Sequence, residues 1–247
     1  MKFFLTLFLI ISSFVCLSQR GPASISSAAN LPGGSNGFSG GTNNFLNLNT
    51  GKWIKNNNKK LDIEGTTYLF NKWNNVVVIN SYDGKQYKLR DVNFNLKTNG
   101  IEAKLSDNTQ DSVFIFNSGS INYFSINNKK FVKKIIVKEK NSFFVEELNN
   151  DEKLKLFKYY QIGIIQGSFN PMTQKKTSND KFEKKVAYYI EENNKEKKLK
   201  EIRLSRSYAL QYMKDRKSEI KSFVKKNNLS YRKEKDFIRM INYYNSL

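Results

Sequence analysis

The side chains most able to do chemistry in this sequence are carboxylates that stand next to each other. Three such pairs lie beside expected turns or strand ends: Glu146-Glu147, Asp151-Glu152 and Glu191-Glu192. Two converging carboxylates can hydrolyse a glycosidic bond, one as the acid and the other as base or nucleophile. Adjacent residues of a strand point to opposite faces, however, so no pair can flank one bond by itself. A carboxylate-dependent carbohydrate-active hydrolase is therefore the alternative interpretation.

Other catalytic chemistry is excluded by composition. The 247-residue chain contains no histidine and one cysteine, Cys16. Cys–His pairs, Ser-His-Asp triads and zinc sites built from His or Cys are thereby ruled out. The glycine-rich stretch GGSNGFSGG lacks the preceding strand and the Gly-Lys-Ser/Thr that a phosphate-binding loop requires. We assign no catalytic, metal-binding or cofactor-binding residue.

Aromatic side chains offer a candidate binding surface in place of a reaction centre. The chain has 19 Phe, 13 Tyr and 2 Trp. Trp53, Trp73 and Tyr82, with Tyr68 and Tyr87, lie in its first third, where they could form a surface for a sugar or a peptide. The competing interpretation is that they belong to the core and to cross-strand pairs, as aromatic residues of strands usually do.

Basic side chains are the second candidate for binding. Lys and Arg number 42 against 22 Asp and Glu, a net charge of +20. Only seven of the 42 are arginine, the residue favoured for bidentate recognition of phosphates and bases, and this composition argues against nucleic acid as the partner. Lys221, Lys225 and Lys226 form the densest cluster, in KSFVKKNNLSYRKEKD. We interpret most lysines as solvated surface, and attraction to anionic envelope polysaccharide or lipid head groups as the alternative.

The first residues predict export. Residues 1–18 read as a signal peptide, because a positively charged start precedes an apolar run over residues 3–15 that is too short to span a bilayer. Small residues then permit cleavage before Gln19. A lipoprotein signal with Cys16 as the lipid-bearing residue is the alternative, and the bulky Val15 argues against it. We expect a periplasmic, outer-envelope or secreted protein without a transmembrane segment after cleavage.

The elements that would carry these residues change character along the chain. Residues 19–50 are rich in Gly, Ser and Asn and predict a flexible linker. Residues 51–204 predict short antiparallel strands, because apolar and polar residues alternate and Asp83-Gly84 and Asn99-Gly100 mark tight turns. Within this region the stretch 168–180 reads as an exposed loop centred on Pro171. The expected sheet is a sandwich or a partly open barrel.

The last part of the chain has a helical period. Residues 205–247 predict two or three amphipathic helices packed on the sheet, each with an apolar stripe and a basic outer side. We expect Ser207 to cap the first of them and Ser230 to begin the last. The overall prediction is an α+β fold, an antiparallel β-meander followed by C-terminal helices.

Several longer motifs carry a family resemblance. They are YLFNKWNN, DSVFIF, KLKLFKYYQIGIIQGSFNPM and IKSFVKKNNLSYRKEKDFIRMINYYN, together with a signal that ends in Ser-Gln. Over most of residues 60–247 the chain resembles a group of uncharacterised secreted or envelope proteins of AT-rich Gram-negative bacteria. The resemblance implies export and the β-then-α order, and it implies no activity. The leading hypothesis is an exported non-catalytic protein that binds a protein or a polysaccharide of the cell envelope.

Overall fold

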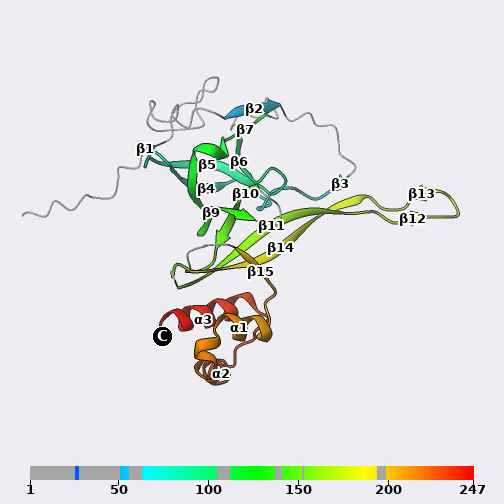
Figure 1. Cartoon of the computed structure of the whole chain (residues 1–247). Helices are drawn as coiled ribbons and strands as arrows, with labels where there is room; N and C mark the ends of the chain where they lie inside the picture. Colours follow the sequence, from blue (N-terminus) through cyan, green and yellow to red (C-terminus); the bar gives the residue numbers. More distant parts are fainter. Residues whose placement is uncertain are drawn as a thin grey trace, which may run out of the picture.

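A computed structural model describes residues 26–27, 51–55, 63–104, 112–136, 141–151, 153–193 and 199–247. It shows one large, mostly antiparallel sheet with three helices packed below it in the view of Figure 1. The predicted α+β fold, a meander followed by helices, is confirmed. The expected signal peptide, and the expected linker apart from Ser26–Ser27, lie outside the described residues.

The main sheet consists of two meanders joined side by side. Its path runs β15-β14-β11-β10-β9-β8-β4-β5-β6-β7-β2, and its ends do not pair with each other, so the sheet is open. The strands on this path are β2 (Lys52–Lys55), β4 (Asn75–Ser81), β5 (Gln86–Asn95), β6 (Gly100–Lys104), β7 (Ser112–Ile115), β8 (Ile121–Ile126), β9 (Lys129–Ile136), β10 (Asn141–Glu147), β11 (Leu154–Ile165), β14 (Asp180–Glu192) and β15 (Lys200–Ile202). Two short strands pair in parallel with β5 and β14: β1 (Ser26–Ser27) and β3 (Ile63–Glu64).

Turn residues account for several hairpins. The predicted Asp83-Gly84 turn joins β4 to β5, and Gly84 has a φ of 79° that few other residues adopt. The predicted Asn-Gly turn joins β5 to β6, with Asn99 at a φ of 49°. Between β8 and β9, two consecutive asparagines have φ values of 48° and 63°. Positive φ at both central positions matches the right-handed twist of a tight hairpin.

The sheet encloses a core in which aromatic side chains are prominent. Phe94, Phe124, Phe131 and Phe144 come from four different strands and are at most 2% exposed. The Phe124 ring stacks on Phe131 at a centroid distance of 4.8 Å and meets Phe144 edge-on at 5.1 Å. Full burial of one such side chain stabilises the fold by roughly 1.5–3 kcal/mol. The apolar residues of the alternating strands thus lie in the core, as the sequence pattern predicted.

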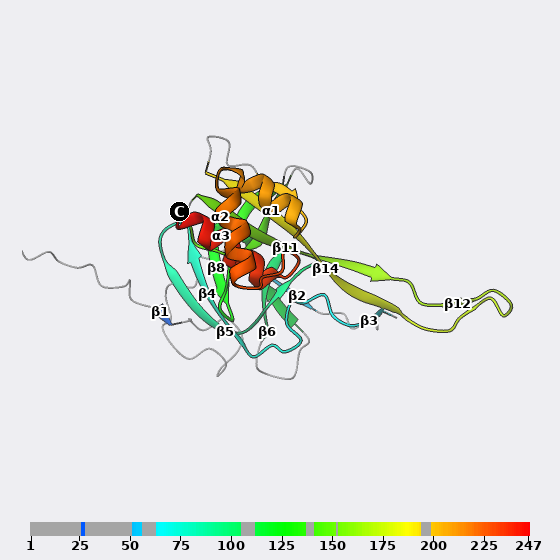
Figure 2. The same ribbon diagram turned by 90° about the horizontal axis from the view of Figure 1, so that it is seen from below.

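The helices cover one side of β11, β14 and β15 with a second core. They are α1 (Arg206–Tyr212), α2 (Lys217–Lys226) and α3 (Glu234–Asn245). Leu156 and Ile190 of the sheet belong to one buried cluster with Ile220, Phe237 and Ile241 of the helices. Figure 2 shows the same arrangement from the helical side.

Both predicted helix starts are wrong by a few residues. Ser205, not Ser207, caps α1, because Ser205 has extended backbone angles and its hydroxyl accepts a hydrogen bond from the Tyr208 N–H. Ser230 lies in a turn before α3, where its N–H donates to the Asp236 carboxylate at 3.0 Å. The helix itself begins at Glu234.

Strands β11 and β14 continue beyond the sheet as a projecting hairpin, which we call the arm (residues 161–187). They pair over twelve positions, from Leu154 with Glu192 to Ile165 with Lys181. At the far end, β12 (Phe169–Asn170) and β13 (Lys175–Lys176) form a two-stranded tip. Figures 1 and 2 both show the arm extending away from the body of the molecule.

The arm corrects the prediction of a loop over residues 168–180. The two chains of the hairpin stay together through this segment, because the Gly167 N–H donates to the Asp180 carboxylate at 2.8 Å. A Cβ on Gly167 would lie 1.9 Å from the Ser178 carbonyl oxygen, so only glycine allows this approach. Strand β14 accordingly begins at Asp180, the last residue of the expected loop.

Candidate functional site

The carboxylate pairs do not converge on one point. Glu146 and Glu147 are neighbours on β10 and serve separate partners. Glu146 accepts hydrogen bonds from the Lys129 ammonium and the Tyr160 hydroxyl, both at 2.6 Å, whereas Glu147 pairs with Lys130 at 2.6 Å. Among the described residues, these carboxylates therefore hold neighbouring strands together.

Of the other two carboxylate pairs, Glu191-Glu192 likewise has separate partners. Glu191 is buried and forms an ion pair with Lys134. Its neighbour Glu192 lies 3.8 Å from Lys200. Glu152 lies outside the described residues. The opposite orientation of adjacent strand residues, expected from the sequence, separates the members of both described pairs.

A polar cluster fastens the helices to the sheet. Glu234, the first residue of α3, accepts hydrogen bonds from the Lys158 ammonium at 2.7 Å and from the Tyr188 hydroxyl at 2.6 Å. Burial tends to raise the pKa of Glu234, but these two donors outweigh it and the pKa lies below its usual value. Burial and the bond to Glu234 raise the pKa of Tyr188. The cluster thus keeps Glu234 ionised and α3 in place.

Trp73 and Tyr68 take structural roles in the sheet. Their rings meet edge-on at 4.7 Å, and the Lys104 ammonium lies 4.8 Å from the centre of the Trp73 ring. The Tyr68 hydroxyl donates to Glu102 at 2.6 Å, and Glu102 is 2% exposed. These aromatic side chains pack against the strands around them.

The predicted aromatic residues do not form one surface. Tyr82 is 61% exposed in the turn that follows β4, whereas Trp73 precedes that strand, so the two lie beyond opposite ends of β4. Tyr87 is 2% exposed in the core. Trp53 pairs with Phe114 through its backbone, and its side chain lies outside the described residues.

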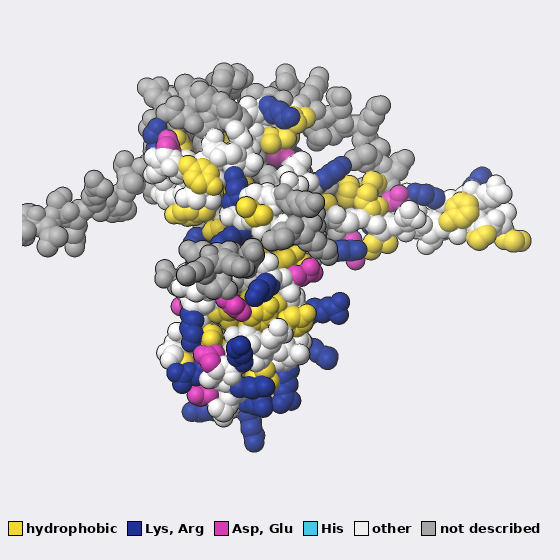
Figure 3. Space-filling view, in the orientation of Figure 1, with side chains coloured by type: hydrophobic (Ala, Val, Ile, Leu, Met, Phe, Trp, Pro, Cys, Tyr) yellow, Lys and Arg dark blue, Asp and Glu magenta, His cyan; other side chains and the backbone are white. Residues whose placement is uncertain are grey.

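The structure brings the predicted lysines together on α2. Lys221, Lys225 and Lys226 are all exposed on this one helix. Residues 205–247 contain eleven basic and four acidic side chains. The four acidic ones already have partners within the molecule: Asp215, Glu219, Glu234 and Asp236. Positive charge therefore predominates at the helical end, where Figure 3 shows many dark blue side chains.

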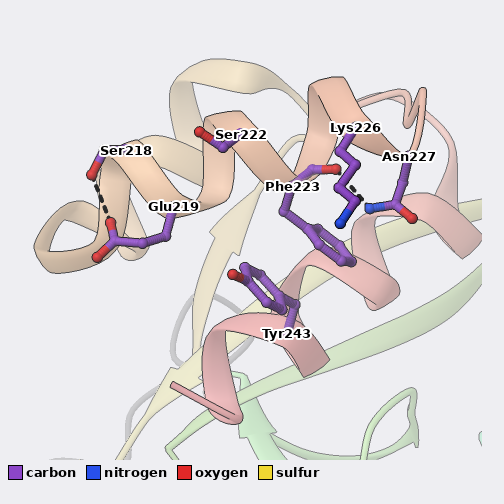
Figure 4. A pocket seen from close by; sticks show the side chains of 7 residues that line it. All are labelled: Ser218, Glu219, Ser222, Phe223, Lys226, Asn227 and Tyr243. Carbon is purple, nitrogen blue, oxygen red and sulfur yellow. Dashed lines mark hydrogen bonds between the residues drawn. The ribbon is translucent and has the colours of Figure 1, made fainter.

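A groove of about 600 Å³ lies along α2 and is closed on one side by α3. Its lining consists of Ser218, Glu219, Ser222, Phe223, Lys226, Asn227 and Tyr243. Figure 4 shows the Phe223 and Tyr243 rings stacked below α2, with Ser222 and Lys226 above them. The two rings are nearly parallel, with centroids 4.0 Å apart.

A second hollow of about 670 Å³ lies where β11, β14 and β15 meet the α1–α2 junction. Four of its charged groups form ion pairs, Lys153 with Asp215 and Lys200 with Glu192. Asp215 accepts a hydrogen bond from the Tyr244 hydroxyl at 2.9 Å. Burial and this bond raise the pKa of Tyr244 to about 12. Lys153 lies 3.9 Å from the centre of the Tyr244 ring. This hollow serves the contact between helices and sheet.

The arm carries an unusual share of exposed apolar side chains. Among the described residues nine large hydrophobic side chains are exposed, and five of them lie on the arm: Ile164, Ile165, Phe169, Met172 and Val186. Met172, at the tip, is 92% exposed. Figure 3 shows apolar side chains at the far end of the arm and along it nearer the body.

One side of the arm continues the core surface and is covered only in part, since the Lys184 ammonium donates a hydrogen bond to the Leu69 carbonyl at 3.1 Å. Successive even-numbered residues of β11 pack first on the helices at Leu156, then on the sheet core at Tyr160 and Ile162. The next residue on that side, Ile164, is 54% exposed. It pairs directly with Phe182. We call Ile162, Ile164, Phe182, Lys184 and Val186 the arm face.

Sequence reasoning missed the arm face as a candidate site. Pro171 and the surrounding polar residues suggested an ordinary loop, which hid the pairing of β11 with β14. The signal that could have revealed it is the run Ile162-Gly-Ile-Ile165, which carries apolar residues past the point where neighbouring strands end.

Comparison with known proteins gives no match, whether to a protein family, to a curated protein or to a solved structure. Within the described residues, no helix has both the length and the apolar character needed to cross a bilayer. The same residues contain no group of three or more acidic, His or Cys side chains placed to hold a metal ion. The arm and the α2 groove are the two candidate sites that the described residues offer.

Proposed function

We propose that this chain is an exported, non-catalytic binding protein that contacts a partner protein of the cell envelope through its arm. The observation that carries the proposal is the concentration of exposed apolar side chains on the arm. Single exposed apolar residues are ordinary on a protein surface, whereas a contiguous group marks a contact site. The arm face and the tip carry these side chains on an element that projects from the body.

The shape of the arm favours a protein as the partner. The arm face consists of consecutive cross-strand pairs, Ile164 with Phe182 and Ile162 with Lys184. An apolar sheet face is complementary to another sheet or to a helix. Strand β11 is paired with β10 only at Phe157 and Lys158, so its edge along the arm has no strand partner within the described residues. A partner strand can add to such an edge through backbone hydrogen bonds.

Charge disfavours a second copy of the chain as the partner. Lys184 lies in the middle of the arm face, and the whole chain carries a net charge of +20. Two copies meeting face to face would bring their lysines together, and like charges oppose such contact. A partner with an acidic group opposite Lys184 would gain an ion pair instead.

Site-specific photo-crosslinking tests the proposal. A photoreactive phenylalanine analogue is placed at Ile164 or at Met172, with Ile135 as the control because it is 65% exposed on the body. In cells of the source organism, we expect one discrete crosslinked protein at the two arm positions and none at position 135. Equal patterns at all three positions would contradict the proposal. Mass spectrometry of the exported protein should find Gln19 as its first residue.

A further inference from the structure

The α2 groove has unused polar groups beside an apolar floor. The Ser222 hydroxyl, the Lys226 ammonium and the Tyr243 hydroxyl have no hydrogen-bond or ion-pair partner within the described residues. Phe223 and Tyr243 stack below them and are half-buried. Figure 4 shows Lys226 extending toward the Phe223 ring, and the Tyr243 hydroxyl directed along the groove toward Glu219.

These groups define the chemistry of an occupant. The volume of about 600 Å³ lies within the usual range of ligand sites. The Lys226 ammonium favours a ligand with an anionic group, and the Ser222 and Tyr243 hydroxyls favour a ligand that forms hydrogen bonds. The aromatic rings favour a ligand with an apolar surface. Glu219 at the other end accepts hydrogen bonds and repels a second negative charge. A sugar acid with one carboxylate, several hydroxyls and an apolar ring face satisfies all of these.

The rest of α2 extends the site beyond one sugar. Lys217, Lys221 and Lys225 recur every four residues, about 6 Å apart along the helix axis. They lie beside the row formed by Ser218 and Ser222. None of the three has an acidic partner within the described residues. A polymer with one carboxylate on each sugar would therefore meet a cation beyond the groove.

We propose that the α2 groove binds one unit of an acidic polysaccharide, a polymer of hexuronic acid. Lys226 pairs with the carboxylate of the bound sugar, and Ser222 and Tyr243 bind its ring hydroxyls. Lys221 and Lys225 attract the neighbouring units. This site is separate from the arm, so it adds a polymer ligand to the proposed protein partner and does not depend on it.

Titration of the ¹⁵N-labelled full chain with a galacturonic acid tetramer tests the proposal. The matched probe is the fully methyl-esterified tetramer, which keeps the hydroxyls and loses the charges. We expect the acid to shift the backbone amides of residues 218–227 and of Tyr243. The ester should bind at least about fivefold more weakly, because it loses the ion pair with Lys226 and also the attraction of its other units to Lys221 and Lys225.

Three variants locate the binding. Lys226→Gln should weaken binding of the acid about fivefold, and Lys97→Gln, the same change of charge in the exposed turn between β5 and β6, by less than twofold. Ser222→Phe fills the groove at an exposed position, leaves every charge in place, and should abolish the shifts. Amide shifts spread over all basic surfaces, or equal losses with Lys226→Gln and Lys97→Gln, would overturn the proposal.

A lipid surface is the competing occupant. Sedimentation with phosphatidylglycerol vesicles distinguishes it from the sugar. Binding to these vesicles without any response to the tetramer would also overturn the proposal. Both results are independent of the crosslinking at the arm.

Discussion

Replacement of Glu234 by Gln should loosen the helices from the sheet. The change removes the negative charge that accepts two short hydrogen bonds, from Lys158 and from Tyr188. Each hydrogen bond to a charged group contributes about 1.5–3 kcal/mol, and the glutamine can still accept one weaker bond. The Lys158 side chain is only 14% exposed and would lose its counter-charge. We therefore expect the free energy of unfolding to fall by about 2–3 kcal/mol.

Urea denaturation followed by two signals measures this loss. Both tryptophans, Trp53 and Trp73, belong to the sheet region, so their fluorescence reports on the sheet. Circular dichroism at the helical wavelengths reports on the C-terminal helices. In Glu234→Gln we expect the helical signal to change at a lower urea concentration than the fluorescence, because the lost hydrogen bonds join the helices to the sheet and do not hold the sheet itself together.

The contribution of Glu234 to stability should decrease as the pH falls. The pKa of Glu234 in the folded state lies below its usual value of 4.5. Its contribution to stability is therefore present above about pH 4.5 and disappears as the pH falls through the folded-state pKa. The difference between wild type and Glu234→Gln should shrink accordingly in acid.

An exposed carboxylate provides the control. Glu219 lies 3.5 Å from Arg216 on the surface, and Glu219→Gln should cost less than about 0.5 kcal/mol. The reasoning is refuted if Glu234→Gln costs no more than Glu219→Gln. It is equally refuted if the loss persists undiminished at pH 3.

Three further predictions concern the core, the arm and a tyrosine. Phe124→Ala should lower the free energy of unfolding by about 3–5 kcal/mol in urea denaturation, because the fully buried ring stacks on other aromatic side chains. Gly167→Ala should separate the arm chains near Ser178 and speed limited proteolysis there, without changing the melting temperature of the body. Tyr244 should ionise only near pH 12 in an ultraviolet titration, so its stabilising effect is lost as the pH rises from 10 toward 12. Asp215→Asn should lower that pKa.

The sheet and the helical stripes were predictable because they follow local rules. Alternation along the first half of β5 identifies its buried side, and the Asn99 turn identifies one hairpin. Within the apolar stripes predicted for the helices, Val224 and Ile241 are buried, whereas Phe223 is only half-buried.

The candidate sites depend on contacts between residues far apart in the sequence, which no local pattern encodes. The groove exists because Phe223 of α2 meets Tyr243 twenty residues later, and their stacking depends on how the two helices pack. The arm exists because β11 pairs with a strand across a segment that contains Pro171. A proline and several polar residues suggest a loop, and only the close approach of Gly167 to Ser178 shows a continued hairpin.

The hairpin of β11 and β14 also has a mechanical consequence. The two strands are joined to each other at twelve positions, but β11 pairs with β10 at only two and β14 with β15 at only three. A force applied at the tip is therefore carried along the hairpin without opening it and reaches the seams with β10 and β15. Lys158 of β11 and Tyr188 of β14 pass part of that load to α3 through Glu234. We expect the protein to yield under tension at these seams, with the hairpin still intact.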